Sequence, residues 1–436
     1  MSITQRERQI LMTDEAAPRV AYPWNVSASL DKQINSKAFL NYSSKLSEKK
    51  ILFLDGLRAL AILPVLGFHQ VSNSLHSFFG SSGWVGVETF FVISGFLITN
   101  LCLSELSKTG TINLKYFWAR RILRIAPALL VFLAVACVFG AGLPYVLVAA
   151  FSCFDILLVT HFIPVNVDAM PLVHTWTLGM EEKFYLILPL VLLTWRSRLT
   201  GLEQNKWARS LFALLVSAFL AMVAYRSIHY LCFATSVRLF AGFDTHLDGL
   251  LLGAAGAVLL HYKDAFPQFT KLSVHWFVVV LLFAGFVFST LKIGHPELII
   301  SRNPNGILNW WMLKLPLHSL VTTALLVSLL KCSNQSSPVH WLLSNNLMAF
   351  VGRLSYSLYL WHGIATNQIY QVLITCQPHL TAHVDVVKYS LCLSLASVSY
   401  FLIEKPFLKL KDRFKPRHSA IEPLSRDASC LVESRR

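Results

Sequence analysis

Apolar runs close to membrane-spanning length recur along almost the whole chain. About 20 apolar helical residues cross the roughly 30 Å hydrocarbon core of a bilayer, so each run is typical of a transmembrane helix. The pattern predicts an all-α, polytopic transmembrane helix bundle. The ten predicted spans are 57 to 73, 84 to 103, 126 to 142, 175 to 195, 208 to 226, 247 to 261, 274 to 291, 315 to 331, 350 to 371 and 386 to 403.

An eleventh apolar run, residues 145 to 163, contains Asp155. Lysine and arginine concentrate on the cytoplasmic side of membrane proteins, and a full crossing here would turn the basic segment 196 to 209 outward. We therefore predict ten crossings with both termini cytoplasmic, and a re-entrant or interfacial segment at 145 to 163 that enters from the outside. Irregular backbone at membrane depth needs protein or water around it, which fits the wall of a cavity.

Polar segments flank the apolar body. Residues 1–50 lack the short apolar core and small-residue cleavage site of a signal peptide, so we expect a retained cytoplasmic polar tail. Residues 51–407 form the predicted membrane domain, and residues 408–436 a basic cytoplasmic tail.

Composition agrees with membrane insertion. Hydrophobic residues make up 55% of the 436 residues and charged residues 14%, and the mean hydropathy is +0.54. The formal net charge of +15 comes from basic residues between spans and in the tails. Topology explains this distribution, so we expect no nucleic-acid partner. The eight cysteines form no CxxC pair, and we expect neither a metal site nor a disulfide framework.

The first apolar run carries Asp55, Arg58 and His69, which are costly residues inside a membrane. Eleven helical residues turn through about three turns plus roughly 20°, so Arg58 and His69 lie on one face, about 16 Å apart along the axis. We place His69 near the middle of the bilayer. Arg58 could simply reach lipid phosphate and His69 could be a hydrogen-bonded core residue, but an imidazole there could also act as a general base.

Two further segments place charges at or within apolar runs. Glu88 lies inside the second span, where pairing with a neighbouring helix, through Arg58 or His69, is as reasonable as a catalytic role. In FWARRILRIAP, residues 117 to 127, Arg121 and Arg124 share one helical face and Arg120 flanks them. This patch either anchors anionic lipid or holds the phosphates of a cytosolic donor through guanidinium forks.

The segment HTWTLGMEEKFYLILP, residues 174 to 189, carries Glu181, Glu182 and Lys183 in a span. Adjacent helical residues point about 100° apart, so one glutamate can face a cavity while the other pairs with a basic residue. A functional role is favoured over packing here.

Later polar residues are less specific. Arg238, Asp244, His246 and Asp248 form either an ion-paired hinge or an acceptor entrance. Aromatic residues in VGRLSYSLYLWH, residues 351 to 362, are more often a belt or core than a ligand site. We expect Glu404, at the end of the last span, to be paired near the cytoplasmic face.

In this order, the motifs resemble those of the acyltransferase-3 family of integral membrane O-acyltransferases, over roughly residues 51 to 407. The family's arginine followed after ten residues by histidine is matched by Arg58 and His69, and its Arg-x-x-Arg pair by Arg121 and Arg124. Its other patterns are matched by FFVISGFLI (90 to 98), TWTLGMEEKFY (175 to 185), SYSLYLWH (355 to 362) and IEKPF (403 to 407).

The resemblance implies transfer of an acyl group, most often acetyl, from cytosolic acyl-CoA to a hydroxyl of a cell-envelope glycan, such as lipopolysaccharide or another polysaccharide, or of another extracytoplasmic acceptor. The setting would be a bacterial inner membrane. No tightly bound cofactor is implied. We expect acyl-CoA, the acceptor and the lipid bilayer as partners, and an envelope-assembly partner or a homo-oligomer is left open.

The same resemblance suggests residue roles. His69 would be the essential histidine and Glu181 the acid of the catalytic segment, with Glu182 beside it. Arg58, Arg121 and Arg124 would hold the CoA phosphates, and we add Arg120 from the same patch. The expected supporting residues are Asp55, Glu88, Trp176, Asp248, Tyr356 and His362.

The sequence departs from the family pattern at several positions. Thr177 stands where Ser is usual, Lys183 where Gln is common, and His246 where Arg is frequent, and Gly179 and Met180 precede the glutamates. Because Lys183 changes the local charge, the division of roles between Glu181 and Glu182 is left open.

Two mechanisms and a second function stay open. The acyl group could pass directly to the acceptor or through an acyl-His69 intermediate. The alternative function is a proton-coupled transporter of a glycan or lipid intermediate, with buried His and Glu residues as its proton path. The arginine patch and the lack of an inverted repeat argue against transport.

Overall fold

The computed structural model describes residues 52–69, 83–165, 167–199, 201–233, 236–271, 274–292, 313–332, 337–411 and 414. Every regular element within these ranges is a helix, as the apolar pattern predicts. The predicted N-terminal tail and most of the predicted C-terminal tail lie outside them.

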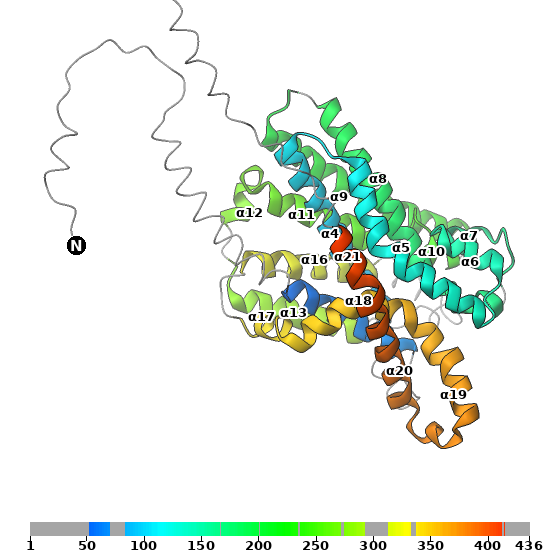
Figure 1. The fold of residues 1–436 in the computed structure, drawn as a ribbon. Coiled ribbons are helices and arrows are strands. Elements are labelled where there is room, and N and C mark those ends of the chain that lie inside the picture. Colours follow the sequence, from blue (N-terminus) through cyan, green and yellow to red (C-terminus); the bar gives the residue numbers. More distant parts are fainter. Residues whose placement is uncertain are drawn as a thin grey trace, which may run out of the picture. The chain divides into compact units, whose positions relative to one another are not determined.

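Figure 1 shows the described helices in chain order. The first is Leu52–His69. The longer ones after it are α4 (Gly83–Thr109), α5 (Leu114–Val138), α8 (Trp176–Arg198), α9 (Gln204–Phe233), α11 (Asp248–His261), α13 (Trp276–Lys292), α16 (Leu315–Lys331), α18 (Asn346–Ile364) and α20 (Val384–Ser399). The shorter ones are α6 (Leu143–Ala150), α7 (Phe154–Thr160), η1 (Val167–Thr175), α10 (Ser236–Ala241), η2 (Lys263–Ala265), α12 (Pro267–Lys271), α17 (Pro338–Leu343), η4 (Ala365–Ile369), α19 (Tyr370–Cys376), η5 (Pro378–His383), η6 (Tyr400–Glu404) and α21 (Lys405–Lys411).

In the part of the chain that the structure describes, five helical stretches are long and apolar enough to cross a membrane: Leu52–His69, Gly83–Thr109, Leu114–Val138, Gln204–Cys232 and Pro378–Leu410. Three shorter apolar helices, α11, α13 and α16, accompany them. Each predicted span overlaps a helix or a run of joined helices. The number of crossings and the side on which the termini lie stay predictions.

Two predicted spans are offset from the helices that they overlap. α5, predicted at 126 to 142, begins at Leu114, where the Asn113 side chain accepts a hydrogen bond from the Tyr116 amide at 3.1 Å, and it runs on through the arginine patch and Pro127. The described part of the first helix, predicted at 57 to 73, is Leu52–His69. Hydropathy misplaces the start of α5 because a capping side chain, as well as apolar length, decides where a helix begins.

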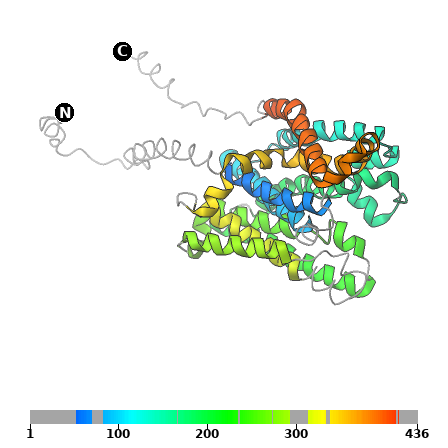
Figure 2. The ribbon, with the colours of Figure 1, turned by 90° about the horizontal axis from the view of Figure 1, so that it is seen from below.

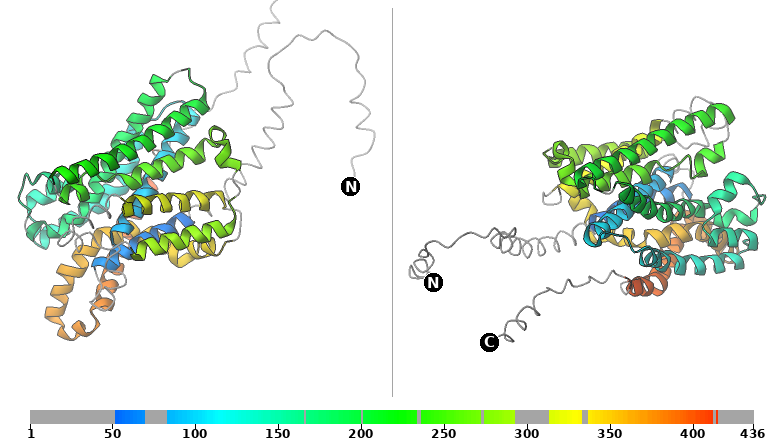
Figure 3. Two further views of the ribbon diagram at one scale, coloured as in Figure 1. Left: turned by 180° about the vertical axis from the view of Figure 1, so that it is seen from behind. Right: turned by 90° about the horizontal axis from the view of Figure 1, so that it is seen from above.

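The apolar run at 145 to 163 folds as two short helices, α6 and α7, joined at residues 151–153 (Figure 3). At 1.5 Å per residue they are about 12 Å and 10 Å long, so neither can cross a core of roughly 30 Å. Lys183 of α8 donates to the Ser152 carbonyl at 3.1 Å and to Asp155 Oδ1 at 2.7 Å. The run is therefore not a single transmembrane helix, and its buried aspartate is paired with Lys183 of α8.

Glycines allow close approach between helices at the centre of the bundle. A Cβ on Gly253 of α11 would lie 2.1 Å from the Val92 carbonyl of α4, and one on Gly352 of α18 would lie 1.8 Å from the Asp55 carbonyl. Figure 2 shows helix Leu52–His69, in blue, among helices from both halves of the chain. Small residues are the usual means of such packing between membrane helices.

Candidate active site

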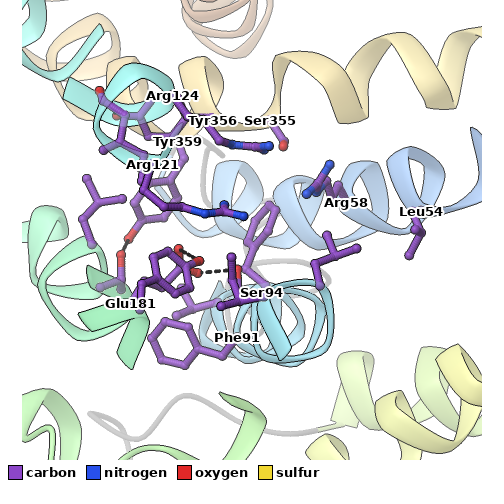
Figure 4. Close-up of a pocket in the computed structure, with 18 of the residues that line it drawn as sticks. Leu54, Arg58, Phe91, Ser94, Arg121, Arg124, Glu181, Ser355, Tyr356 and Tyr359 are labelled. Carbon is purple, nitrogen blue, oxygen red and sulfur yellow. Dashed lines mark hydrogen bonds between the residues drawn. The ribbon is translucent and has the colours of Figure 1, made fainter. Parts of the chain in front are cut away.

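A cavity of about 330 Å³ lies between helix Leu52–His69, α4, α5, α8 and α18 (Figure 4). Its lining includes five of the charged residues that the sequence singles out. Those in the lining are Asp55, Arg58, Arg121, Arg124 and Glu181, together with Ser94, Thr177, Tyr185, Tyr356 and Tyr359.

Three arginines face this cavity. Figure 4 shows the side chains of Arg58, Arg121 and Arg124 reaching into the same space from the first helix and from α5. Asp55 binds the Arg58 guanidinium at 3.2 Å, and the Arg121 guanidinium lies 5.3 Å from the centre of the Tyr185 ring. Among the described residues, the pair with Asp55 is the one hydrogen bond that these three guanidinium groups make, so most of their donors are available to an anion.

Glu181 is held in place by two hydroxyl groups. Ser94 Oγ donates to its Oε1 at 2.8 Å, and the Tyr185 hydroxyl donates to its Oε2 at 2.9 Å. Each carboxylate oxygen thus accepts a hydrogen bond from its own hydroxyl group, one on α4 and one on α8. These two bonds fix the side chain of Glu181 against the cavity wall.

Glu182 lines a second cavity, which Glu181 does not line. Its Oε1 is buried and has no hydrogen-bond partner among the described residues. The two carboxylates therefore serve different spaces, as the rotation of about 100° between adjacent helical residues requires.

His69 belongs to a cluster of three histidines. Its ring centre lies 4.7 Å from that of His362, and the His362 ring lies 4.9 Å from that of His174. The Tyr359 hydroxyl donates to the His174 carbonyl at 2.9 Å and lies 2.7 Å from the Thr177 hydroxyl. Because Tyr359 and Thr177 also line the arginine cavity, the cluster adjoins its end.

His69 is the last described residue of its helix, and its side chain is exposed. Because the helix is continuous from Leu52 to His69, Arg58 and His69 lie about 16 Å apart along its axis. The depth of His69 in the bilayer stays a prediction.

Arg120 lies outside the cavity. It donates to Glu105 at 3.1 Å and to the Phe414 carbonyl at 2.8 Å. The predicted patch is therefore divided. Arg121 and Arg124, three residues apart on one helical face, line the cavity, whereas Arg120 is bonded to other residues of the protein.

Two predicted supporting residues lie in separate buried networks. Glu88 accepts from the Ser319 hydroxyl at 2.5 Å and lies 3.0 Å from His246 Nε2, so its partners are not Arg58 or His69. Asp248 forms a two-pronged ion pair with Arg226, at 2.6 and 3.0 Å.

The predicted cluster at 238 to 248 therefore divides among different partners. Arg238 binds Asp244 at 2.5 Å near the surface, while His246 and Asp248 face other helices.

The remaining predicted residues make separate contacts. Trp176 lies near the His246 ring, with 5.8 Å between ring centres. Tyr356 lines the cavity and donates to the Ile125 carbonyl at 2.9 Å, and Glu404 accepts from the Ser357 hydroxyl.

The sequence interpretation missed Ser94, Tyr185, His174 and Arg226 as partners. Hydroxyl residues are ordinary in spans, so Ser94 and Tyr185 gave no signal. Arg226, in the apolar helix α9, did carry one, because an intramembrane arginine needs a partner. Among the described residues, no group of three or more His, Cys, Asp or Glu side chains is arranged to hold a metal ion.

Comparison with known proteins gives a family and two informative relatives. The profile of the acyltransferase domain of the acyltransferase-3 family matches residues 51–395. SACOL0978 of Staphylococcus aureus strain COL, whose O-acetyltransferase designation is provisional, is 31% identical over 404 residues, covering 86% of this chain and 59% of its own length. The O-acetyltransferase OatA of S. aureus strain NCTC 8325 is 31% identical over 398 residues, covering 86% of this chain and 60% of its own length.

The chain thus spans about three fifths of the length of these curated relatives. No solved structure matches it. The profile covers most of the helical body, including the cavity lined by Arg58, Arg121, Arg124 and Glu181. The chain belongs to the acyltransferase-3 family of membrane acyltransferases.

Proposed function

We propose that this protein is an O-acyltransferase that moves an acyl group, in the simplest case acetyl, from cytosolic acyl-CoA to a hydroxyl of an extracytoplasmic glycan. The observation that carries the proposal is one cavity lined by three arginines and Glu181, whose lining residue Tyr359 also contacts the histidine cluster. The O-acetyltransferase name of a relative supports the reaction type.

The arginines suit the donor. Guanidinium groups bind phosphate through two parallel hydrogen bonds, and Arg121 and Arg124 present theirs one turn apart on α5. In the predicted topology this end of α5 faces the cytosol, where acyl-CoA is available. The extended arm of CoA would then run along the first helix from Arg58 toward His69, about 16 Å further on.

His69 would act on the acceptor. Its imidazole takes the proton of the acceptor hydroxyl, the oxygen attacks the thioester carbonyl carbon, and a C–O bond forms as the C–S bond breaks. The thiolate of CoA leaves and takes a proton from the imidazolium. Alternatively, His69 itself is acylated first and the acceptor then attacks the acyl-imidazole.

Acyl transfer in proteoliposomes tests this proposal. With labelled acetyl-CoA on the inner face and an envelope glycan fraction outside, wild type should label the glycan. His69→Ala should lower the rate by roughly 100-fold or more, the range for loss of a general base.

The matched control is His161→Asn, which changes an exposed histidine at the end of α7. His161 has a positive φ of 51°, and asparagine tolerates that backbone conformation. Equal labelling by wild type and His69→Ala would contradict the proposal. Movement of glycan without acyl transfer would favour the transporter alternative.

A further inference from the structure

A second cavity opens between α5, the α6–α7 turn and α8. Its volume is about 540 Å³, and we call it the lateral cavity. It is lined by Ile122, Ile125, Ala126, Leu129, Ala150, Phe151, Ser152, Cys153, Glu182, Lys183 and Leu186. Ile125 also lines the arginine cavity, so one side chain borders both spaces.

The rim of the lateral cavity is apolar and exposed. Ile122 is 60% exposed, Phe151 77% and Leu186 52%. Large apolar side chains exposed on the helices of an integral membrane protein face the bilayer, so hydrocarbon chains are the molecules that meet this rim.

The floor of the lateral cavity is polar. Glu182 lines it, and the buried Oε1 of Glu182 has no hydrogen-bond partner among the described residues. An unsatisfied buried acceptor costs about 1–3 kcal/mol, so a ligand that brings a hydrogen-bond donor is favoured here.

Lys183, the cation in the lining of the lateral cavity, has all its donors occupied. Lys183 Nζ donates to Asp155 Oδ1 at 2.7 Å, to the Ser152 carbonyl at 3.1 Å and to the Gly179 carbonyl at 3.2 Å. An ammonium group has three donors, so none is left for a phosphate. Arg121, whose charge also acts on Glu182, lines the arginine cavity instead. Within the lining of the lateral cavity the unpaired group is therefore an acceptor, which disfavours an anionic headgroup.

We propose that the lateral cavity is a binding site for an uncharged, hydroxyl-bearing membrane lipid, whose chains lie against the exposed rim and whose hydroxyl donates to Glu182. This site is separate from the donor site, and lipid binding there does not depend on the acyl-transfer proposal.

Native mass spectrometry of the full-length protein in detergent tests the site with three probe lipids. Diacylglycerol carries the hydroxyl, its O-methyl ether lacks the donor, and phosphatidic acid carries a phosphate. We expect diacylglycerol to bind roughly tenfold more tightly than the ether, because one hydrogen bond to a carboxyl oxygen is lost. Equal retention of diacylglycerol and the ether, or tighter binding of phosphatidic acid, would overturn the proposal.

Filling the cavity gives the second arm of the test. Ala126→Trp places an indole in the lateral cavity and should abolish diacylglycerol retention. The matched control is Leu130→Trp on the same helix, at a position that is 57% exposed and lines neither cavity. Equal retention by Ala126→Trp and Leu130→Trp would refute the assigned location.

Should Ala126→Trp melt at a lower temperature than wild type, Leu186→Trp replaces it. Leu186 is at the exposed rim, where an indole narrows the cavity without entering the core. Retention of diacylglycerol by Leu186→Trp at the wild-type level would then count against the site.

Discussion

Replacing Arg226 with leucine should destabilise the helix bundle more than replacing both members of its ion pair. Arg226 Nη1 donates to Asp248 Oδ2 at 2.6 Å and to the Thr245 carbonyl at 3.0 Å, and Nη2 donates to Asp248 Oδ1 at 3.0 Å. Both charged side chains have 0% exposure. The pair joins α9 to the start of α11, which packs against α4 through its glycines.

The magnitude follows from what each change leaves behind. Arg226→Leu removes the partners of both Asp248 oxygens and leaves an unpaired buried carboxylate. Breaking a buried pair in this way costs about 3–5 kcal/mol of unfolding free energy. Arg226→Leu/Asp248→Leu leaves no charge, and its main unsatisfied group is the Thr245 carbonyl, at about 1–3 kcal/mol.

Unfolding by a denaturing detergent in mixed micelles, followed by circular dichroism, measures the free energies of wild type, both single variants and the double variant. We expect the double variant to be more stable than Arg226→Leu. The reasoning is refuted if the two single losses simply add in the double variant, or if Arg226→Leu costs less than about 1 kcal/mol, the ceiling typical of an exposed pair.

Three further changes test other parts of the structure. In steady-state assays, Arg124→Ala should raise the KM for acyl-CoA by about 10- to 100-fold, because a charge-assisted hydrogen bond to the donor is lost. Arg120→Ala should leave this KM unchanged, because Arg120 binds the chain itself. Equal effects of the two changes would contradict the different placement of the two arginines. Tyr185→Phe removes one of two donors to the cavity glutamate and should lower kcat with little change in the folded fraction; an unaltered kcat would argue against this role. Gly253→Ala would place a Cβ 2.1 Å from the Val92 carbonyl, and the overpacking, which costs about 1–3 kcal/mol, should lower the melting temperature in detergent. An unchanged melting temperature would mean that α11 can move away from α4 at no cost.

Charges within apolar runs were the part of the site that the sequence could predict. Arg58, Arg121, Arg124 and Glu181 each stand out because such residues are costly in a membrane, and all four line one cavity. Their hydroxyl partners did not stand out. Ser94 is an ordinary residue in a span, and its bond to Glu181 depends on how α4 packs against α8.

Pairing between distant residues was beyond the sequence. Glu88 meets His246 across 158 positions of the chain, in a network that no local spacing indicates. Helix ends were uncertain for a different reason. Asn113 starts α5 well before its apolar stretch, because one capping side chain can outweigh the hydropathy of the turn that follows.

Glu181 and Glu182 show both what the sequence could predict and what it could not. The rotation of about 100° per helical residue predicted that Glu181 and Glu182 would face different surroundings. Which carboxylate faces the arginines could not be predicted, since that depends on how α8 is turned within the bundle.

The most direct test of the central claim is a structure of the protein bound to a thioether analogue of acetyl-CoA, which cannot transfer its acyl group. Cryo-electron microscopy should place the analogue's phosphates within hydrogen-bond distance of Arg58, Arg121 and Arg124. Its sulfur should lie beyond Tyr359, on the side of His69. A nucleotide bound elsewhere, with the arginine cavity empty, would contradict the account.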